Sequence, residues 1–339
     1  MRSLIDTVKI DIGKKLSQQE IDCVSWTDIK EDPNTNTVFC RLFDAKDKSL
    51  PRITYTYKKN SDHGWMKVEV SIPHFLHGSN VYEISPADIK NFYRRLRKYL
   101  ARQLRLRLTD IPSIELCEVE KLHFCHNFKV GKHLDAYLRV LSAISLSGYK
   151  PTTYSANGSR QPESVFWKKG KSVLKFYNKY AEVYQNDKSP GKDQHLRAAD
   201  DILRFEVELS DYELRKQSSQ RLAGELLDPL FARRMLKQKL SQLGVDQPLK
   251  ATSLETMFDL IKREHRSGRT RTALLGFVTR IKIEGEGACK RAYGKSRSTY
   301  YSHYNKLKQL LGTDKIVFSD IDLPPLKLKK RDKKRTALT

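Results

Sequence analysis

The sequence has no long run of apolar residues. A membrane-spanning helix needs about 18 or more of them in succession, and no such stretch occurs in the chain. The N-terminus also lacks the long apolar segment behind a basic start that marks a secretion signal. We therefore expect neither secretion nor membrane insertion, and no membrane partner.

Cysteine is scarce. The five cysteines are odd in number and widely spaced, and no two of them have the paired spacing of a zinc site. This predicts reduced thiols in a cytosolic protein rather than a disulfide framework. The chain also has no glycine-rich P-loop, so the chemistry is not expected to depend on ATP.

Positive charge, by contrast, is abundant. Lys and Arg outnumber Asp and Glu by 64 to 40, which gives a formal net charge of +24, and the pI is about 9.7. Such an excess predicts nucleic acid as the partner. Cations crowd one face of an expected helix over residues 86–104, where they could follow a phosphate backbone or form a solvated helix face. The candidate phosphate contacts are Arg94, Arg95, Arg97, Lys98 and Arg102.

Hydrophobic periodicity predicts an α+β fold over the first two thirds of the chain. Helices are expected over residues 86–104 and 133–146, and a Gly- and Ser-containing loop over 151–163. Together with the expected strands, these complete an alternating α+β domain. The expected strands cover residues 38–43, 53–57, 66–72, 118–128, 164–168 and 202–209.

After about residue 215 the composition changes to Leu, Lys, Arg and Glu in helical spacing, as in 221–243 and 254–265. We therefore divide the chain into a catalytic domain (1–215), a helical connector (216–250), a helical DNA-binding region (251–322) and a disordered basic tail (325–339).

Residues 287–311 contain two expected helices joined at Gly294, which suits either a helix-turn-helix or a plain helical hairpin. The residues in this segment that we expect to contact DNA are Arg291, Lys295, Arg297, Tyr300, Tyr304 and Lys306.

Tyr177 lies between Lys175 and Lys179. A tyrosine that attacks a DNA phosphate must lose a proton of pKa about 10, and neighbouring positive charge favours that loss. Tyr180 competes as the nucleophile, and a half-buried strand aromatic is the structural alternative for Tyr177.

Alternating strands also carry candidate metal ligands. Glu69 and Glu206 each point away from their apolar neighbours. In the strand over 118–128, Glu120 and His126 share one face and His123 lies on the other. Carboxylates favour Mg²⁺ or Mn²⁺, and an imidazole favours Mn²⁺. Salt pairing between strands is the alternative.

In their order along the chain, several segments resemble the gene II and gene X type replication initiators of filamentous phages and related plasmids. The resemblance covers roughly residues 65–315. It rests on Val68-Glu-Val70, the helix over 84–100, Lys121-Leu-His123, Glu163-Ser-Val-Phe-Trp167, Leu174-Lys-Phe-Tyr-Asn-Lys179 and Leu203-Arg-Phe-Glu-Val-Glu-Leu209.

This resemblance implies rolling-circle replication in a bacterial cytoplasm. Members of the family nick one strand of origin DNA, remain linked to the 5′ end and later rejoin the displaced strand, alongside the host helicase and polymerase. The implied fold is an antiparallel sheet with helices packed on it, like that of the HUH endonucleases, although the chain has no His-hydrophobic-His triplet.

By the same resemblance, Tyr177 is the nicking tyrosine, Lys179 and Arg204 assist it, and His123 stands where the family has an acid. The implied metal ligands are then Glu69, His123 and Glu206, with Glu120 and His126 as second choices, and the metal is Mg²⁺ or Mn²⁺.

Two other functions fit parts of the sequence. His265-Arg-Ser-Gly-Arg269 with Tyr300, Tyr301 and Tyr304 suits a tyrosine recombinase, although its helical catalytic domain conflicts with the expected strands. A non-catalytic origin-binding protein or repressor would use residues 287–311 alone.

Overall fold

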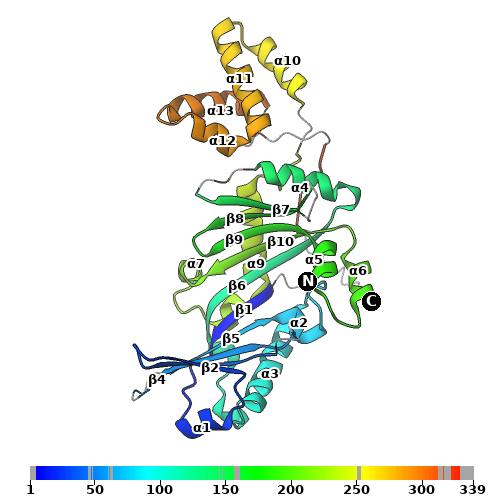
Figure 1. The fold of residues 1–339 in the computed structure, drawn as a ribbon. Coiled ribbons are helices and arrows are strands. Elements are labelled where there is room, and N and C mark those ends of the chain that lie inside the picture. The colour runs from blue at the N-terminus through cyan, green and yellow to red at the C-terminus, as the bar shows by residue number, and fades with distance from the viewer. Residues whose placement is uncertain are drawn as a thin grey trace, which may run out of the picture.

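We analysed a computed structural model of the chain. The structure describes residues 5–44, 47, 49–59, 61, 64–144, 146, 148–155, 161–249, 253–311, 316 and 322–328. Two parts are visible in Figure 1, a large sheet with helices on both of its faces and a separate group of helices at one end. The expected α+β fold with a helical C-terminal region is confirmed.

The sheet has ten strands in the order β2-β3-β4-β5-β1-β6-β10-β9-β8-β7. All of its pairings are antiparallel. The strands are β1 Ile5–Asp11, β2 Asp28–Asp32, β3 Thr37–Leu42, β4 Arg52–Lys58, β5 Gly64–Ser71, β6 Glu118–Lys129, β7 Lys150–Ser155, β8 Pro162–Lys169, β9 Ser172–Asn178 and β10 Ile202–Ser210.

The expectations from sequence periodicity missed three strands, β1, β2 and β9, and misjudged a fourth. β1 lies in the middle of the sheet, between β5 and β6, and β2 forms the edge at one end. The loop expected over 151–163 is also partly wrong, because its first residues form β7, the other edge strand. Residues 156–160 of that loop lie outside the described residues.

One face of the sheet carries the main hydrophobic core and is covered by helices. These are α3 Pro86–Gln103, α4 Leu134–Ala143, α8 Ala223–Leu226 and α9 Pro229–Leu243. α3 begins with a capping box between Ser85 and Asp88 and has Pro86 in its first turn, which is a strong signal for a helix start. Phe231 of α9 packs edge-on against Phe124 of β6, with ring centroids 5.5 Å apart.

The expected connector over 216–250 is therefore wrong. Leu236, Leu240 and Leu243 of α9 are buried in the same core as the strands, because their helical spacing directs them onto the sheet. The sheet domain needs α9 to exclude water from that face, so it does not end at residue 215.

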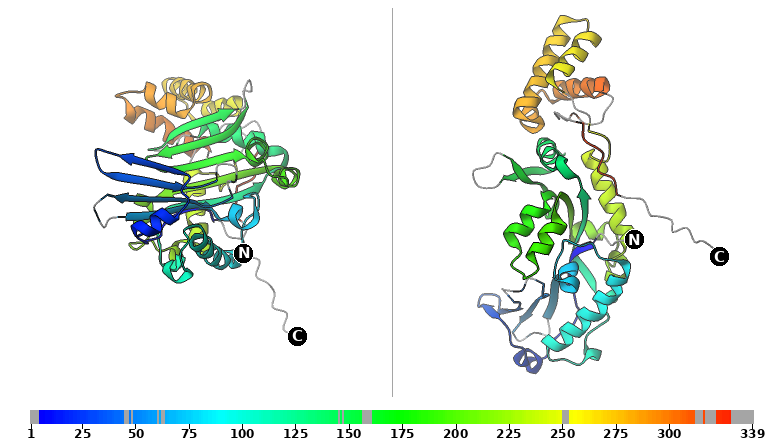
Figure 2. Two further views of the ribbon diagram at one scale, coloured as in Figure 1. Left: turned by 60° about the horizontal axis from the view of Figure 1, so that its bottom comes forward. Right: turned by 90° about the vertical axis from the view of Figure 1, so that its right-hand side faces the viewer.

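The opposite face is covered only in part. α5 Lys179–Asn186, α6 Lys192–Ala199 and the segment 79–85 lie over it, on the side away from α3 and α9 (Figure 2). The remaining short helices are α1 Gln18–Cys23, α2 Ile72–His77, α7 Asp211–Arg215, η1 Leu108–Asp110, η2 Ile114–Leu116 and η3 Gly131–His133.

The separate group of helices, which we call the helical unit, is inserted in the sheet domain rather than appended to it. It contains α10 Leu254–Glu264, α11 Gly268–Glu284, α12 Glu286–Ala292 and α13 Arg297–Leu311, and it has its own core. The chain enters the unit after Leu249 and returns at Leu323, and these two residues pair in an antiparallel bridge. Leu326 then packs into the main core.

The disordered tail expected from residue 325 is thus wrong at its start, since Leu326 is buried and its backbone N–H donates to the Val245 carbonyl at 2.8 Å. A single leucine in a lysine-rich segment gives little sign of burial, and this one is held by the neighbouring bridge. Residues 329–339 lie outside the described residues.

Candidate active site

The site is built where β9 and β10 run side by side. Tyr177 pairs with Arg204, and Lys175 pairs with Glu206. Because side chains alternate along a strand, these four point to the partly covered face of the sheet. Phe176 and Phe205 point to the other face and stack in the main core, with ring centroids 4.4 Å apart. Stacking in the core fixes the register that brings the polar side chains together.

Tyr177 is half-buried, and its hydroxyl donates to Oε1 of Glu206 at 2.6 Å. Burial and the negative charge of Glu206 raise the pKa of the phenol well above its ordinary value, and the charge of Arg204 only partly opposes them. At neutral pH the tyrosine is therefore protonated, and its proton already points at a carboxylate.

Glu206 is buried, yet it stays ionised. Burial opposes the charged form, but Arg204, Lys175 and the hydroxyl of Tyr177 outweigh it and lower the pKa to about 2. The Nε of Arg204 donates to Oε1 at 2.9 Å, and the Nζ of Lys175 lies 3.6 Å from Oε2.

Arg204 itself is fully buried behind Glu206. Its guanidinium donates to the Asn80 carbonyl at 2.7 Å and to Oδ1 of Asn127 at 3.3 Å, and it lies 3.4 Å from a carboxylate oxygen of Asp6. It thereby fastens the segment 79–85 to β10 and holds Glu206. Arg204 does not line the cavity at the site. It therefore holds Glu206 in place rather than contacting a substrate.

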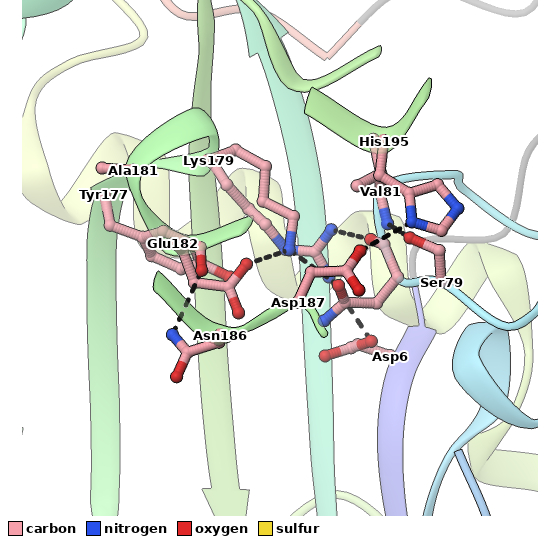
Figure 3. Close-up of polar contacts among 12 residues, drawn as sticks. Asp6, Ser79, Val81, Tyr177, Lys179, Ala181, Glu182, Asn186, Asp187 and His195 are labelled. Atoms are coloured by element: carbon pink, nitrogen blue, oxygen red, sulfur yellow. Dashed lines mark hydrogen bonds and ion pairs between the residues drawn. The ribbon is translucent and has the colours of Figure 1, made fainter. Parts of the chain in front are cut away.

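Lys179 begins α5 directly after Asn178, whose side chain caps the helix by accepting from the Ala181 N–H. Its ammonium is fully buried and donates to Oδ1 of Asn80 at 2.7 Å and to Oε2 of Glu182 at 2.6 Å (Figure 3). Burial and the charge of Arg204 lower the pKa of Lys179. Its Nζ lies 5.9 Å from the centre of the Tyr177 ring.

A cavity of about 350 Å³ opens beside Tyr177. Lys175 is the lysine that faces it, and its Nζ also pairs with Glu208. Tyr180, the alternative nucleophile, is 41% exposed on α5 and does not line the cavity. The lining comprises Asp6, Asn80, Glu163, Ser164, Phe166, Lys175, Tyr177, Asn178, Ala181, Glu182, Gln185, Asn186 and Glu206.

The expected metal ligands do not converge. β1 separates β5 from β6, and the carboxylate of Glu69 lies 3.2 Å from Nζ of Lys121. His123 instead faces Glu208, with Nε2 and Oε2 3.8 Å apart, while Glu206 holds Tyr177 and Arg204. The set Glu69, His123 and Glu206 is thus contradicted by the geometry.

The second-choice ligands are also engaged elsewhere. Glu120 pairs with Lys9 and Lys67, and His126 lies 2.9 Å from Glu83. Throughout the described ranges, no group of three or more carboxylate, imidazole or thiol side chains is arranged to hold a metal ion.

α3, which carries the basic residues, lies on the face of the sheet opposite to α5 (Figure 2). Arg94, Lys98 and Arg102 are exposed there. Arg97 differs, because its Nε donates to the Ile111 carbonyl at 2.8 Å and anchors the chain after the helix. Arg95 is exposed, but its guanidinium lies over the Phe75 ring and donates to the Leu76 carbonyl.

In the helical unit, Arg291, Lys295 and Arg297 are exposed and Lys306 is half-buried. The expected DNA contact of Tyr300 is wrong, because its ring is buried in the core of the unit and its hydroxyl donates to Glu286 at 3.2 Å. Tyr304 packs against the same core and donates to the other oxygen of Glu286 at 3.3 Å. The residues next to these tyrosines in the sequence are mostly polar, so the sequence did not show that the tyrosines face the core.

Sequence reasoning missed three residues of the site, Asp6, Asn80 and Glu182. Asp6 comes from β1, which was not among the expected strands, and Asn80 from a segment without periodic structure, so neither was connected with the site. Glu182 could have been found, since it lies three residues after Lys179 on a helix and therefore on the same face.

A search of curated protein sequences found no match. The model of one protein family, described as the N-terminal region of the gene II replication-associated protein of phages, matches residues 4–227. The chain belongs to this family. Membership indicates a role in initiating DNA replication, with DNA as the partner. The matched region includes the cavity, Tyr177 and Glu206, and it ends before the helical unit.

Two further observations bear on the sequence-based expectations. None of the helices that the structure describes is long and apolar enough to cross a membrane. The matched family and the antiparallel sheet around Tyr177 both disagree with the tyrosine recombinase alternative, which requires a helical catalytic domain.

Proposed function

We propose that this protein nicks one strand of origin DNA through Tyr177 and later rejoins the displaced strand, as an initiator of rolling-circle replication. The observation that carries the proposal is the hydrogen bond from the Tyr177 hydroxyl to an ionised, buried Glu206 at the wall of a cavity. A nucleophile paired with a proton acceptor is the arrangement that covalent catalysis needs.

In the nicking step the Tyr177 oxygen attacks the phosphorus, and its proton passes to Glu206. A bond forms between the tyrosine oxygen and phosphorus, and the bond from phosphorus to the 3′ oxygen breaks. The 3′ oxygen leaves and takes a proton from the water of the open cavity to become a hydroxyl, and Glu206 returns the proton of Tyr177 to that water, so no net charge is left behind. The product is a 5′-phosphotyrosine, which keeps the phosphodiester energy, so a 3′-hydroxyl can reverse the step without ATP.

Positive charges both in the cavity and behind its wall stabilise the phosphate. Lys175 faces the cavity, and because Glu206 and Glu208 outweigh its burial and raise its pKa, it remains charged where the phosphate would lie. Arg204 and Lys179 lie behind the wall. They hold Glu206, Asn80 and Glu182 in place and add to the local positive potential.

A divalent ion, Mg²⁺ or Mn²⁺, remains part of the proposal because the resemblance implies it. When bound, it would act as a Lewis acid on the non-bridging phosphate oxygens. The ligand set expected from the sequence does not fit such an ion, so we assign no step to it.

The helical unit would engage the duplex origin, through the exposed Arg291, Lys295 and Arg297. The host helicase and polymerase would then open the duplex and extend the free 3′-hydroxyl. A protein that only binds the origin would have the same basic unit but would leave the DNA uncut.

The test is incubation of the protein with the supercoiled circular DNA of the replicon that encodes it, with Mg²⁺ or Mn²⁺. We expect nicked circles with protein attached to the 5′ end and a free 3′-hydroxyl. Binding without any nick would show instead that the protein is a non-catalytic origin-binding protein.

A further inference from the structure

The edge of the sheet next to the cavity carries exposed aromatic and basic side chains on the same face as Tyr177. Tyr154 of β7 pairs with Ser164 of β8, which pairs with Tyr177. One step along, Thr152 pairs with Phe166, which pairs with Lys175, and beyond it Lys150 pairs with Lys168. Paired residues share a face. We call Tyr154, Phe166, Lys150 and Lys168 the edge shelf.

The two aromatic rings of the edge shelf form a continuous surface that leads out of the cavity. Phe166 lines the cavity, and the Nζ of Lys175 lies 5.8 Å from its ring centre. Tyr154 packs edge-on against Phe166, with centroids 5.2 Å apart, and is 59% exposed. An aromatic ring this exposed contributes little to the core and is accessible to a ligand.

The lysines of the edge shelf are free to meet an anion. Lys150 and Lys168 are both exposed, and within the described part of the chain neither forms an ion pair. Glu163, an acidic residue of the cavity lining, accepts a hydrogen bond from Gln185 at 3.3 Å. Aromatic rings for bases beside cations for phosphates are the combination that binds single-stranded nucleic acid.

The place of the edge shelf also favours a single strand over a duplex. The Tyr177 hydroxyl is bonded to the buried Glu206 at the wall of the cavity, so we expect the attacked phosphate to enter the cavity without its partner strand. β7 is the edge strand at the end of the sheet nearest the helical unit (Figures 1 and 2). A strand that leaves a duplex held by that unit would cross β7 before it reaches the cavity.

We propose that the edge shelf binds the single-stranded DNA next to the cleaved phosphate, with bases stacked on Tyr154 and Phe166 and phosphates on Lys150 and Lys168. That the bound strand is the one cut by Tyr177 rests on the proposed function. The binding itself does not, and it is measured separately.

The test uses Tyr177→Phe as the background, so that no DNA is cut, and fluorescence anisotropy with a single-stranded oligothymidine and a mixed-sequence duplex of the same length. Tyr154→Ala with Phe166→Leu should weaken oligothymidine binding by about tenfold or more, since each stacked base contributes roughly 1–3 kcal/mol. For oligothymidine binding, the slope of the logarithm of the association constant against the logarithm of the salt concentration should become shallower by about 1.4 in Lys150→Ala with Lys168→Ala. Duplex affinity should change less than twofold in both variants.

Tyr212→Ala is the matched control, because Tyr212 is also an exposed tyrosine beside a lysine but does not line the cavity; it should bind oligothymidine normally. Thermal melting confirms that each variant is folded. Unchanged oligothymidine affinity in folded Tyr154→Ala/Phe166→Leu, or an equal loss of duplex affinity, would contradict the proposal that the edge shelf binds single-stranded DNA. A normal covalent adduct in Tyr177→Phe would instead overturn the proposed nucleophile and leave the edge shelf standing.

Discussion

The hydroxyl of Tyr177 donates a 2.6 Å hydrogen bond to the same oxygen of Glu206 that accepts from Arg204 at 2.9 Å. Arg204 thus keeps the buried carboxylate ionised, and the carboxylate holds the tyrosine proton. The negative charge of Glu206 also raises the pKa of Tyr177. The nucleophile therefore rests in its neutral form, and we expect its proton to move only when a phosphate arrives in the cavity.

Replacing Glu206 by Gln should remove the proton acceptor while keeping a side chain that can still contact Tyr177 and Arg204. We expect the nicking rate to fall by about 10²–10⁴-fold, the usual contribution of general-base catalysis. Single-turnover cleavage of origin DNA measures the rate, and anisotropy measures DNA affinity, which should change little. Glu163→Gln is the control, since Glu163 lines the same cavity without a bond to Tyr177; equal losses in both variants would contradict the assignment.

The same carboxylate predicts how stability depends on pH. The folded-state pKa of Glu206 is about 2, below its ordinary value of 4.5. Its ionised form therefore stabilises the fold above about pH 4.5, and this contribution is lost as the pH falls toward 2. The difference in unfolding free energy between the wild type and Glu206→Gln should be largest at neutral pH and narrow below pH 4.5. Urea unfolding at pH 7 and pH 3 measures it, and a difference independent of pH would refute the prediction.

Glu69 should not be needed for cleavage, because its carboxylate pairs with Lys121 away from the cavity. Glu69→Gln should nick within about twofold of the wild-type rate and respond to added Mg²⁺ or Mn²⁺ as the wild type does. If a chelator stops wild-type nicking and Glu69→Gln needs much more metal to recover, Glu69 is a ligand after all.

Removing the helical unit should separate cutting from duplex binding. Since Leu249 and Leu323 pair directly, a short glycine linker between residues 249 and 322 should close the sheet domain without residues 250–321. This variant should fold and cut single-stranded origin DNA but bind duplex origin weakly, as judged by thermal melting, oligonucleotide cleavage and anisotropy. A chain that ends at residue 215 should fail to fold, because it lacks α9. Unchanged duplex affinity in the excised variant would assign duplex binding to the sheet domain.

The local chemistry of the site could be predicted from the sequence. Alternation along the expected strand over 202–209 places Arg204 with Glu206. The same alternation over 172–178, which was not among the expected strands, places Tyr177 with Lys175 and turns Phe176 to the core face. The stacking of Phe176 on Phe205 fixes the register in which β9 and β10 pair. This register also follows from the alternation, because a one-residue slip would bury the charged side chains.

Relationships between distant segments could not be predicted. The alternation Val8-Lys-Ile-Asp-Ile12 is typical of a strand, but it does not show that β1 lies between β5 and β6, where it keeps Glu69 away from His123. The same strand supplies Asp6. Strand order depends on how the whole chain packs, and the pattern of a single sequence does not show which strands are neighbours.

The sequence also did not show which side chains of the C-terminal helices are buried. Tyr300 lies among polar residues in the sequence, and its hydroxyl suggested a surface position. In the structure its ring fills the core of the helical unit and the hydroxyl is satisfied by Glu286. An amphipathic tyrosine is compatible with either environment, so only the packing of the neighbouring helices decides its place.

The measurement that tests the central claim most directly is the mapping of the covalent adduct. Wild-type protein is allowed to react with single-stranded origin DNA and digested with protease and nuclease, and the peptide that carries the nucleotide is identified by mass spectrometry. The account predicts a nucleotide on Tyr177, and no adduct at all in folded Tyr177→Phe with normal DNA affinity. A nucleotide on Tyr180, or an adduct of normal yield in Tyr177→Phe, would contradict it.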